Sequence, residues 1–317
     1  MADCVVGVDL GGTKILTALV DSRGRILGRV REATPRTGPE AVVETIVETV
    51  RRVLKEGNVE QESLRGIGVG APGPSDPASG VVFEPPNLPG WHDVPLAQML
   101  TGRLALKATV ENDANAAALG EHWMGAGRGI DDLIYITIST GVGGGLIFRG
   151  RLYHGVSGTA GEVGHMVIDP TGPRCPCGRM GCLEALASGT AIARDARAAV
   201  AEGRPTSLSA AGASLSAIDV ARAAREGDPL AREIFTRAAR YVGIGVTNLV
   251  NLLNPAMVII GGGVSGAGDL LFAPVRRIVR EEAFERPGAA VQIVPAALGD
   301  DAGVVGAAAV ALERSRA

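Results

Sequence analysis

The chain has 317 residues and a formal net charge of −3, with 46% apolar and 21% charged residues. This length allows two domains of about 150 residues each, and the composition is that of a globular protein. The weakly negative charge gives no reason to expect a nucleic acid or a membrane as partner. No leader sequence opens the chain, and no apolar run reaches the roughly 18 residues of a membrane helix, so we expect a cytoplasmic protein.

The first part of the chain predicts a sheet followed by a helix. Residues 4–9 are a short apolar run that indicates a buried strand, and the sequence Leu-Gly-Gly-Thr closes it with a turn. Further elements are predicted from the same patterns, namely strands at 15–20, 25–30 and 66–71 and an amphipathic helix at 42–54.

The same order of strand, glycine turn and strand returns half a chain later. Residues 133–140 predict a strand, followed by a glycine loop at 141–145 and two more strands at 146–150 and 151–155. Because internal repeats decide architecture, the two matching hairpins predict two similar domains that face one ligand.

Beyond residue 185 the pattern is mainly helical, and the whole chain is typical of a mixed α/β protein. The remaining predicted elements are helices at 188–203, 216–226, 228–253 and 268–286, strands at 257–263 and 291–295, a polar loop at 203–215 and an apolar terminal helix. We expect a small α/β domain at 1–112, joined by the terminal helix 302–317, and a larger α/β domain at 113–301.

The Asp-Leu-Gly-Gly-Thr-Lys sequence after the first strand is a candidate phosphate loop. Its adjacent glycines, Gly11 and Gly12, let backbone N–H groups converge on a phosphate, because no Cβ atom obstructs them. Thr13 adds a hydroxyl donor, Lys14 adds a positive charge, and Asp9 suits water bound to a metal ion. A plain hairpin turn is the alternative, and the residue order differs from that of the Walker P-loop.

Two further glycine loops follow predicted strands. Residues 139–145 repeat the chemistry of the first loop without a positive charge, and a flexible hairpin is the alternative there. Residues 261–266 match the pattern G-x-G-x-x-G, with Glu281 twenty residues beyond Gly261. An NAD-dependent dehydrogenase is therefore an alternative function, although a single match of this kind is weak evidence.

The sequence Glu-Asn-Asp-Ala-Asn at 111–115 lies between a predicted strand and a predicted helix. An Asp at a strand end that points into a cleft is suited to accept a hydroxyl proton during phosphoryl transfer. Asn and Asp are also the usual N-cap residues of helices. The spacing alone leaves a catalytic and a capping role equally open.

One histidine and three cysteines have the spacing of a zinc site. The four residues are His165, Cys175, Cys177 and Cys182. This Cys₃His set suits tetrahedral Zn²⁺, and because protein fills all four positions we expect a structural ion; unrelated core cysteines are the alternative. Glu162 and Glu184 flank the ligands, so the ion would fix two carboxylates, which suit sugar hydroxyl groups.

Together these residues resemble the ROK family of kinases and repressors, within the actin-like ATPase fold, and specifically its bacterial glucokinases. The resemblance spans nearly the whole chain, and the zinc motif together with Glu-Asn-Asp-Ala-Asn is highly specific. The motifs in the expected order are D-L-G-G-T-K, A-P-G-P, N-L-P-G-W, E-N-D-A-N-A-A, S-T-G-V-G-G-G, G-E-V-G-H, C-P-C-G-R-M-G-C-L-E and G-G-G-V-S. The implied fold is a duplicated α/β fold of the ribonuclease H type, with a nucleotide and sugar cleft between two domains.

The resemblance implies a kinase that transfers the γ-phosphoryl group of ATP to the 6-hydroxyl of glucose, with Mg²⁺ and a structural Zn²⁺ ion. Asp113 would be the general base, and His165 would serve zinc and sugar at once. The sugar-binding set would be Asn112, Asp113, Glu162, His165 and Glu184. The nucleotide contacts would be Gly11, Gly12, Thr13, Lys14, Thr140, Gly141, Gly262 and Gly263, with Asp9 near Mg²⁺.

Alternatives stay open within this resemblance. Related enzymes act on fructose, mannose, allose or N-acetylmannosamine, and polyphosphate is a conceivable donor in place of ATP. The repressors of the family carry a DNA-binding helix-turn-helix before the kinase-like part, whereas here the first phosphate loop begins at residue 9, so we do not expect a repressor. Members are commonly dimers or tetramers, and we expect a homo-oligomer.

Overall fold

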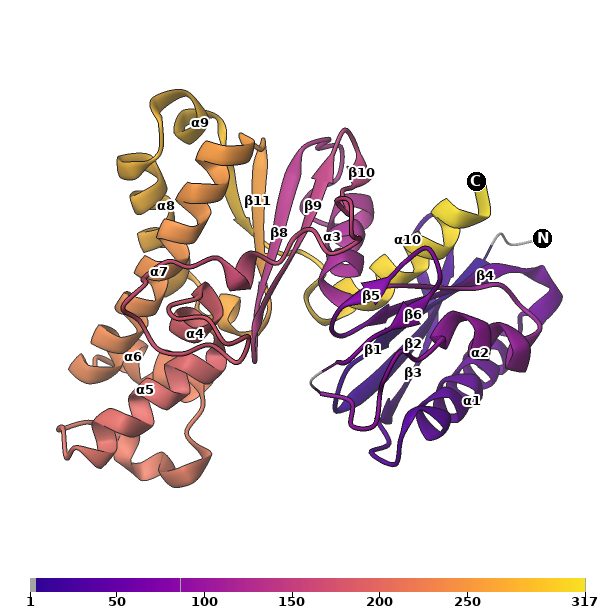
Figure 1. Ribbon diagram of the computed structural model, residues 1–317, viewed down its shortest axis with the longest axis horizontal. Coiled ribbons are helices and arrows are strands. Elements are labelled where there is room, and N and C mark those ends of the chain that lie inside the picture. The colour runs from indigo at the N-terminus through magenta and orange to yellow at the C-terminus, as the bar shows by residue number, and fades with distance from the viewer. Residues whose placement is uncertain (1–3, 86, 317) are drawn as a thin grey trace. The chain divides into compact units, whose positions relative to one another are not determined.

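The structure, a computed structural model, describes residues 4–85 and 87–316, which form two compact units (Figure 1). The first unit consists of Met1–Asp131, Gly145–Gly161 and Ala297–Ala317, and the second of Asp132–Gly144 and Glu162–Ala296. The predicted domain ends at residues 1 and 317 lie outside the described residues. Within those described, no helix combines the length and apolarity needed to span a membrane.

A five-stranded sheet with the order β3-β2-β1-β4-β7 forms the centre of the first unit. Its strands are β1 (Cys4–Leu10), β2 (Lys14–Asp21), β3 (Ile26–Ala33), β4 (Leu64–Ala71) and β7 (Ala108–Asn112). β2 runs antiparallel to β1 and β3, whereas β1, β4 and β7 are parallel. Asp9 pairs with Gly70 and Gly70 with Glu111, so the ends of β1 and β7 lie at the same edge of the sheet.

Helices cover both faces of this sheet. They are α1 (Pro39–Gly57), α2 (Leu96–Leu104), α3 (Asp113–Met124) and α10 (Ala302–Arg316). Because alternate strand residues point to opposite faces, Val6 of β1 lies in the core with α1 and α2, whereas Val5 lies in the core with α10. α3 packs closely on α10, where a Cβ atom on Gly306 would lie 1.6 Å from the Ala116 carbonyl oxygen, so this approach requires glycine.

The domain division expected after residue 112 remains a proposal. The packing of α3 against α10 bears on it, because α3 follows that residue and nevertheless belongs to the first compact unit. The terminal helix α10 belongs to the first unit as well.

The second sheet has the order β10-β9-β8-β11-β12. Its strands are β8 (Leu133–Ile138), β9 (Val142–Phe148), β10 (Arg151–Leu152), β11 (Met257–Gly261) and β12 (Gln292–Pro295). β10 is antiparallel to β9, whereas β8, β11 and β12 are parallel. Both sheets thus place their strands in the chain order third, second, first, fourth and fifth, which confirms the predicted repeat. The boundary between the two units falls inside β9, after Gly144.

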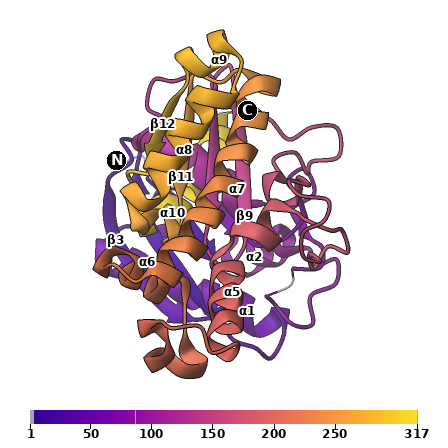
Figure 2. The same ribbon diagram turned by 90° about the vertical axis from the view of Figure 1, so that its left-hand side faces the viewer.

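The rest of the second unit is mainly helical. Its helices are α4 (Leu183–Ala187), α5 (Gly189–Ala201), α6 (Ala217–Glu226), α7 (Pro229–Leu253), α8 (Asp269–Glu282) and α9 (Glu285–Ala290). α7 packs against α4, α5, α6 and α8, and Figure 2 shows α7 and α8 in front of the sheet strands β11 and β12. α7 begins with Pro229 after the N-cap Asp228, whose carboxylate accepts a hydrogen bond from Ala231 N at 2.9 Å.

Two predictions around the second hairpin are wrong. Residues 141–145 are not a loop, because β9 already begins at Val142. Its glycines allow close packing on α3, since a Cβ atom on Gly145 would lie 2.6 Å from that of Ala118. The strand expected at 151–155 is reduced to the two residues of β10.

Other elements also differ from the prediction. The helix expected at 268–286 breaks at Ala283 and Phe284, which are not helical. The polar loop 203–215 contains the 3₁₀ helix Ser207–Ser214. α2 and the short strands β5 (Ser75–Asp76) and β6 (Val81–Val82) were not expected. Shorter 3₁₀ helices are found at Gln61–Ser63, Val163–His165, Gly263–Ala267 and Gly299–Asp301.

Candidate active site

The turn from β7 to α3 carries the two residues of the predicted catalytic motif. Asn112 is the N-cap of α3, and its Oδ1 accepts hydrogen bonds from Ala114 N at 2.9 Å and Asn115 N at 3.2 Å. Its Nδ2 donates to the Gly73 carbonyl at 3.2 Å. The capping role left open by the sequence is therefore the observed role of Asn112.

Asp113 is the first residue of α3, and its carboxylate is half-buried. Its Oδ1 accepts a hydrogen bond from Ala114 N at 2.8 Å. A carboxylate in the first turn of a helix is stabilised as the anion by the helix dipole. The turn thus places the Asp113 carboxylate at the end of a strand and the start of a helix, with the cap supplied by its neighbour Asn112.

The first glycine loop connects β1 to β2 in the same unit. Gly11 N donates to the Lys14 carbonyl at 2.9 Å, and the Thr34 hydroxyl donates to the Gly11 carbonyl at 2.6 Å. Thr34 N also donates to the Thr13 carbonyl at 3.2 Å. Gly12 lies against Asn87, and an added Cβ atom would come within 2.6 Å of the Asn87 Cβ. The loop is therefore a tight, internally bonded turn.

Asp9 lies at the end of β1, directly before this loop. Burial raises the pKa of its carboxyl group, Lys14 opposes that shift, and the negative charge of Asp300 reinforces it. Two neighbouring carboxylates, of the half-buried Asp9 and the exposed Asp300, fit the preference of Mg²⁺ for oxygen ligands. The sequence analysis did not predict that Asp300 would lie near Asp9. The only sequence feature that could have indicated it is the pair of aspartates directly before α10.

The connection Ser139–Gly141, which is what remains of the second predicted glycine loop between β8 and β9, is fixed by contacts within the second unit. Ser139 N donates to the Gly141 carbonyl at 2.9 Å, and the Thr190 hydroxyl donates to the Thr140 carbonyl at 2.8 Å. Glu184 accepts from Val142 N at 2.9 Å. A Cβ atom on Gly141 would lie 2.4 Å from the Glu184 carboxylate, so this loop and the predicted sugar ligand Glu184 are in direct contact.

The third glycine loop follows β11. Gly262 has a φ angle of 82°, and an added Cβ atom would lie 2.4 Å from the Ile138 carbonyl oxygen. Gly263 then begins a 3₁₀ helix, and α8 starts only at Asp269. In a dinucleotide-binding unit the glycine loop leads directly into the helix whose N-terminus binds the pyrophosphate. This arrangement does not favour the dehydrogenase alternative.

The four predicted zinc ligands come together in the second unit. The ligand atoms of His165, Cys175, Cys177 and Cys182 all lie within 4.8 Å of one another. Cys175 Sγ is 3.7 Å from His165 Nδ1, and Cys177 Sγ is 3.6 Å from Cys182 Sγ. Ligands bonded at 2.0–2.3 Å to a tetrahedral ion lie about 3.3–3.8 Å apart. The set therefore fits Zn²⁺, with His165 Nδ1 as its nitrogen ligand.

The thiol chemistry of the cluster also suits a cation. Burial raises the pKa of the Cys175 thiol to about 12, and burial also raises the pKa of Cys182. A backbone hydrogen bond from Arg179 lowers the pKa of Cys177 to about 6. Three thiols at this distance do not all ionise unless a cation compensates their charge, as Zn²⁺ does.

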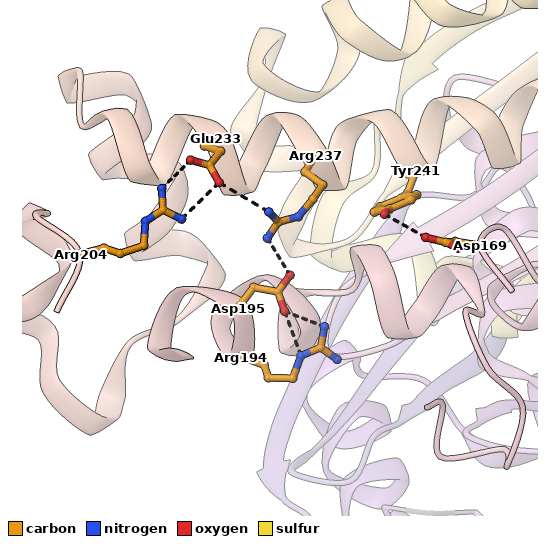
Figure 3. A network of polar contacts seen from close by, with 7 residues as sticks. All are labelled: Asp169, Arg194, Asp195, Arg204, Glu233, Arg237 and Tyr241. Atoms are coloured by element: carbon orange, nitrogen blue, oxygen red, sulfur yellow. Dashed lines mark hydrogen bonds and ion pairs between the residues drawn. The ribbon is translucent and has the colours of Figure 1, made fainter. Parts of the chain in front are cut away.

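The loop that carries the ligands also positions Glu162. Glu162 precedes the 3₁₀ helix Val163–His165, and its Oε2 lies 3.9 Å from His165 Nε2, the ring nitrogen opposite the thiols. Asp169 in the same loop accepts a hydrogen bond from the Tyr241 hydroxyl at 3.4 Å, and Figure 3 shows Tyr241 of α7 pointing toward it. The loop that carries the four candidate ligands is thus tied to α7, the longest helix of the unit.

The predicted site residues fall into two sets, each within one compact unit. The first unit holds Asp9, Gly11, Gly12, Thr13, Lys14, Asn112 and Asp113. The second unit holds Thr140, Gly141, Glu162, His165, Cys175, Cys177, Cys182, Glu184, Gly262 and Gly263. Each set is brought together from distant parts of the chain.

Comparison with known proteins decides the family. The sequence pattern of the ROK family matches residues 5–314. The chain belongs to the ROK family. Within the family, the glucokinase of Thermotoga maritima is 40% identical to this chain over 314 residues, which cover 98% of each chain.

Solved structures of the ROK family share the fold. The ROK hexokinase from Thermus thermophilus is 40% identical with a TM-score of 0.83, and 99% of each chain is covered. The ROK family glucokinase from Streptomyces griseus, in complex with glucose and AMPPNP, is 40% identical with a TM-score of 0.84, covering 98% of this chain and 99% of that one. This ROK chain accordingly has the actin-like ATPase fold that its motifs predicted.

Proposed function

We propose that this ROK protein is an ATP-dependent glucokinase, which transfers the γ-phosphoryl group of ATP to the 6-hydroxyl of glucose. The observation that carries the proposal is the Asn112–Asp113 turn, where a half-buried carboxylate stands at the first position of α3. Relatives similar over nearly the whole chain support glucose as substrate, since they are glucokinases and one was solved with glucose and AMPPNP.

In the proposed mechanism Asp113 accepts the proton of the sugar 6-hydroxyl as the oxygen attacks the γ-phosphorus. Phosphoryl transfer depends mainly on positioning and charge stabilisation, so the base needs a fixed direction more than an unusual pKa. The capped turn supplies that direction. We assign the sugar hydroxyls to Asn112, Glu162, His165 and Glu184.

We assign the ATP phosphates to the loops at Gly11–Lys14 and Thr140–Gly141 and the adenosine to Gly262 and Gly263. Asp9, with Asp300 nearby, would hold Mg²⁺ through water, and the ion would neutralise charge on the phosphates. The Cys₃His set would hold a structural Zn²⁺ ion, which orders the loop between Glu162 and Glu184. We also propose a homodimer or homotetramer that works in the cytoplasm, where thiols stay reduced.

Steady-state kinetics on the purified protein tests the proposal. Glucose, fructose, mannose, allose and N-acetylmannosamine would each be offered with ATP and with polyphosphate, in the presence of Mg²⁺. We expect the highest kcat/KM for glucose with ATP and little ATP hydrolysis when sugar is omitted. The assignment would be overturned if none of these pairs gave a phosphorylated sugar, or if the protein bound operator DNA specifically.

A further inference from the structure

Glu111, the last buried residue of β7, is a charged side chain that the proposed reaction does not use. It is only 1% exposed. One carboxylate oxygen, Oε1, accepts hydrogen bonds from Asn112 N at 3.1 Å and from Asn115 Nδ2 at 3.0 Å. The other, Oε2, lies 2.8 Å from His154 Nε2. A buried carboxylate is tolerated only when its oxygens are paired in this way.

The two bonds to Oε1 enclose Asp113 from both sides. Asn112 N precedes Asp113 in the chain, and the Asn115 side chain lies in the first turn of α3 that follows it. Among the described residues, the Asn115 Oδ1 atom has no hydrogen-bond partner. The Asn115 amide is therefore oriented by its bond to Glu111, and a shift of this carboxylate would move both flanks of Asp113.

His154 holds the opposite side of the same carboxylate. The ring follows β10 and is about one-third exposed, with a relative accessibility of 32%. Its carbonyl accepts a hydrogen bond from Ala160 N at 3.0 Å, which closes the short loop between them. Since a carboxylate oxygen only accepts, Nε2 carries the proton in this pair. His154 thus fixes Oε2 through a ring that belongs to a closed loop.

We propose that Glu111 and His154 are positioning residues for Asp113, with His154 holding the Glu111 carboxylate and Glu111 holding the turn. The inference rests on the proposed function, since Asp113 is the base there. A displacement of about 1 Å at a reacting group costs roughly a hundredfold in rate. Loss of the His154 contact would leave one oxygen of a buried carboxylate unpaired, which draws the side chain toward water and away from the turn.

The chain contains a matched pair for comparison. His92 Nδ1 lies 3.1 Å from Glu84 Oε1, and both side chains are about three-quarters exposed, at 76% and 74%. The same two side-chain types therefore meet in water there and in the protein interior at Glu111. An exposed pair has a small effect because water replaces each partner. His92→Leu is accordingly the control for His154→Leu.

The first measurement is a set of kcat and KM values for His154→Leu, His154→Gln and His92→Leu. We expect His154→Leu to lower kcat roughly 10- to 100-fold, with the KM for ATP unchanged. His154→Gln keeps an N–H donor and should recover most of the lost rate, and His92→Leu should behave as wild type. A wild-type kcat in His154→Leu would overturn the proposal.

A double-mutant cycle separates positioning from a general loss of structure. If His154 acts through Asp113, His154→Leu should change the residual rate little when Asp113→Asn is already present, so the two effects are not additive. Equal losses in both backgrounds would show a purely structural role and overturn the inference. If Asp113→Asn alone retained the wild-type kcat, the assignment of the base would fail instead, which distinguishes the two failures.

Discussion

The two regions that carry the proposed substrate ligands are built by different means. The turn at Glu111–Asn115 is made by a strand end and a helix start, and it is fixed by hydrogen bonds that the Asn112 cap and the buried Glu111 carboxylate accept. Residues 166–182, all of which the structure describes, contain no helix or strand, only isolated bridges such as Val167 with Cys182. The turn thus belongs to regular secondary structure, whereas the loop contains none and carries the thiol and imidazole cluster.

This difference separates the two tasks of the proposed reaction. A catalytic base must be held in one orientation. A strand end and a helix start give this orientation without ordering a separate loop. Ligands for several hydroxyl groups must come from separate places, here Glu162 and Glu184 at the two ends of an irregular loop. Ordering such a loop costs about 1–2 kcal/mol per residue. The proposed structural Zn²⁺ ion would offset this cost, because metal binding contributes free energy to folding.

The largest expected effect comes from the residue at the centre of the turn. Asp113→Asn preserves shape but removes basicity, so kcat should fall by about 10²–10⁴. The fold of the turn should remain, because the amide oxygen still accepts from Ala114 N. Glucose binding measured by calorimetry should survive. A kcat near that of wild type would contradict the assignment of Asp113 as the base.

Loss of the metal should affect the other region and leave the turn intact. Cys177→Ala should lose zinc and raise the sugar KM by roughly tenfold or more, because ordering one additional residue costs about 1–2 kcal/mol. Nucleotide affinity without sugar should stay nearly unchanged. Metal analysis, thermal unfolding and glucose kinetics measure the three effects.

Cys4 provides the control for that experiment. It is buried in β1, outside the cluster. Cys4→Ala should keep one zinc ion per chain. A Cys177→Ala protein that loses zinc and still binds glucose normally would show that the ion contributes stability only.

A second capped helix, α7, tests how far the stabilising effect of a helix cap depends on the charge of the capping side chain. Asp228 caps α7, and although burial alone would raise its pKa, hydrogen bonds from Ala231, Ser207 and Thr206 lower that pKa well below its usual range. The stability it contributes is present above the unfolded value near 3.9 and is lost as the pH falls toward the folded value. Asp228→Asn should cost about 1 kcal/mol at pH 7, because its hydrogen bonds from Thr206 and Ser207 are then no longer made to a charged group. The difference from wild type should shrink below about pH 4.

Urea denaturation at neutral and acidic pH measures this difference. Asn112, the neutral cap of α3, should contribute equally at both pH values, since its amide does not titrate in this range. A constant difference between Asp228→Asn and wild type across this range would show that the charge of the cap is irrelevant.

Several parts of the fold and the site were predictable from local patterns. The repeated strand and turn order reappears as two sheets with the same strand order, because hydrophobic runs and glycine turns specify hairpins locally. The four predicted metal ligands meet in space, since the spacing of three cysteines restricts them to one tight loop. Their partner His165 lies ten residues before Cys175, and the same spacing argument included it in the set.

Other parts depend on contacts between distant segments and have no local pattern. Glycines 143–145 suggest a loop, yet they lie in β9 because α3 requires small residues opposite Gly145. The contact between His154 and Glu111 joins residues 43 positions apart, and neither residue has a motif that indicates the other. Asp300 approaches Asp9 only because α10 returns to the first sheet.

The smallest expected effect concerns the ion pairs on the helical surface of the second unit. Figure 3 shows a chain of contacts in which Arg204 pairs with Glu233 at 2.6 Å and Arg237 with Asp195 at 3.1 Å, while Glu233 and Arg237 lie 3.7 Å apart. Their side chains are 25–49% exposed, so water and salt screen them. Arg237→Ala should therefore lower the free energy of unfolding by only about 0.2–1 kcal/mol.

Salt separates this surface chain from the buried contacts of the turn. At 1 M salt the Debye length is about 3 Å, so the difference between Arg237→Ala and wild type should nearly vanish, whereas the effect of His154→Leu on kcat should persist. Urea denaturation at low and high salt measures the first, and glucose kinetics in the same buffers measures the second. Salt screening removes only what solvent-exposed charges contribute to stability. If Arg237→Ala instead lowered the free energy of unfolding by well over 1 kcal/mol, and did so at 1 M salt as well, this series of surface ion pairs would be a structural element comparable to the cap of α7.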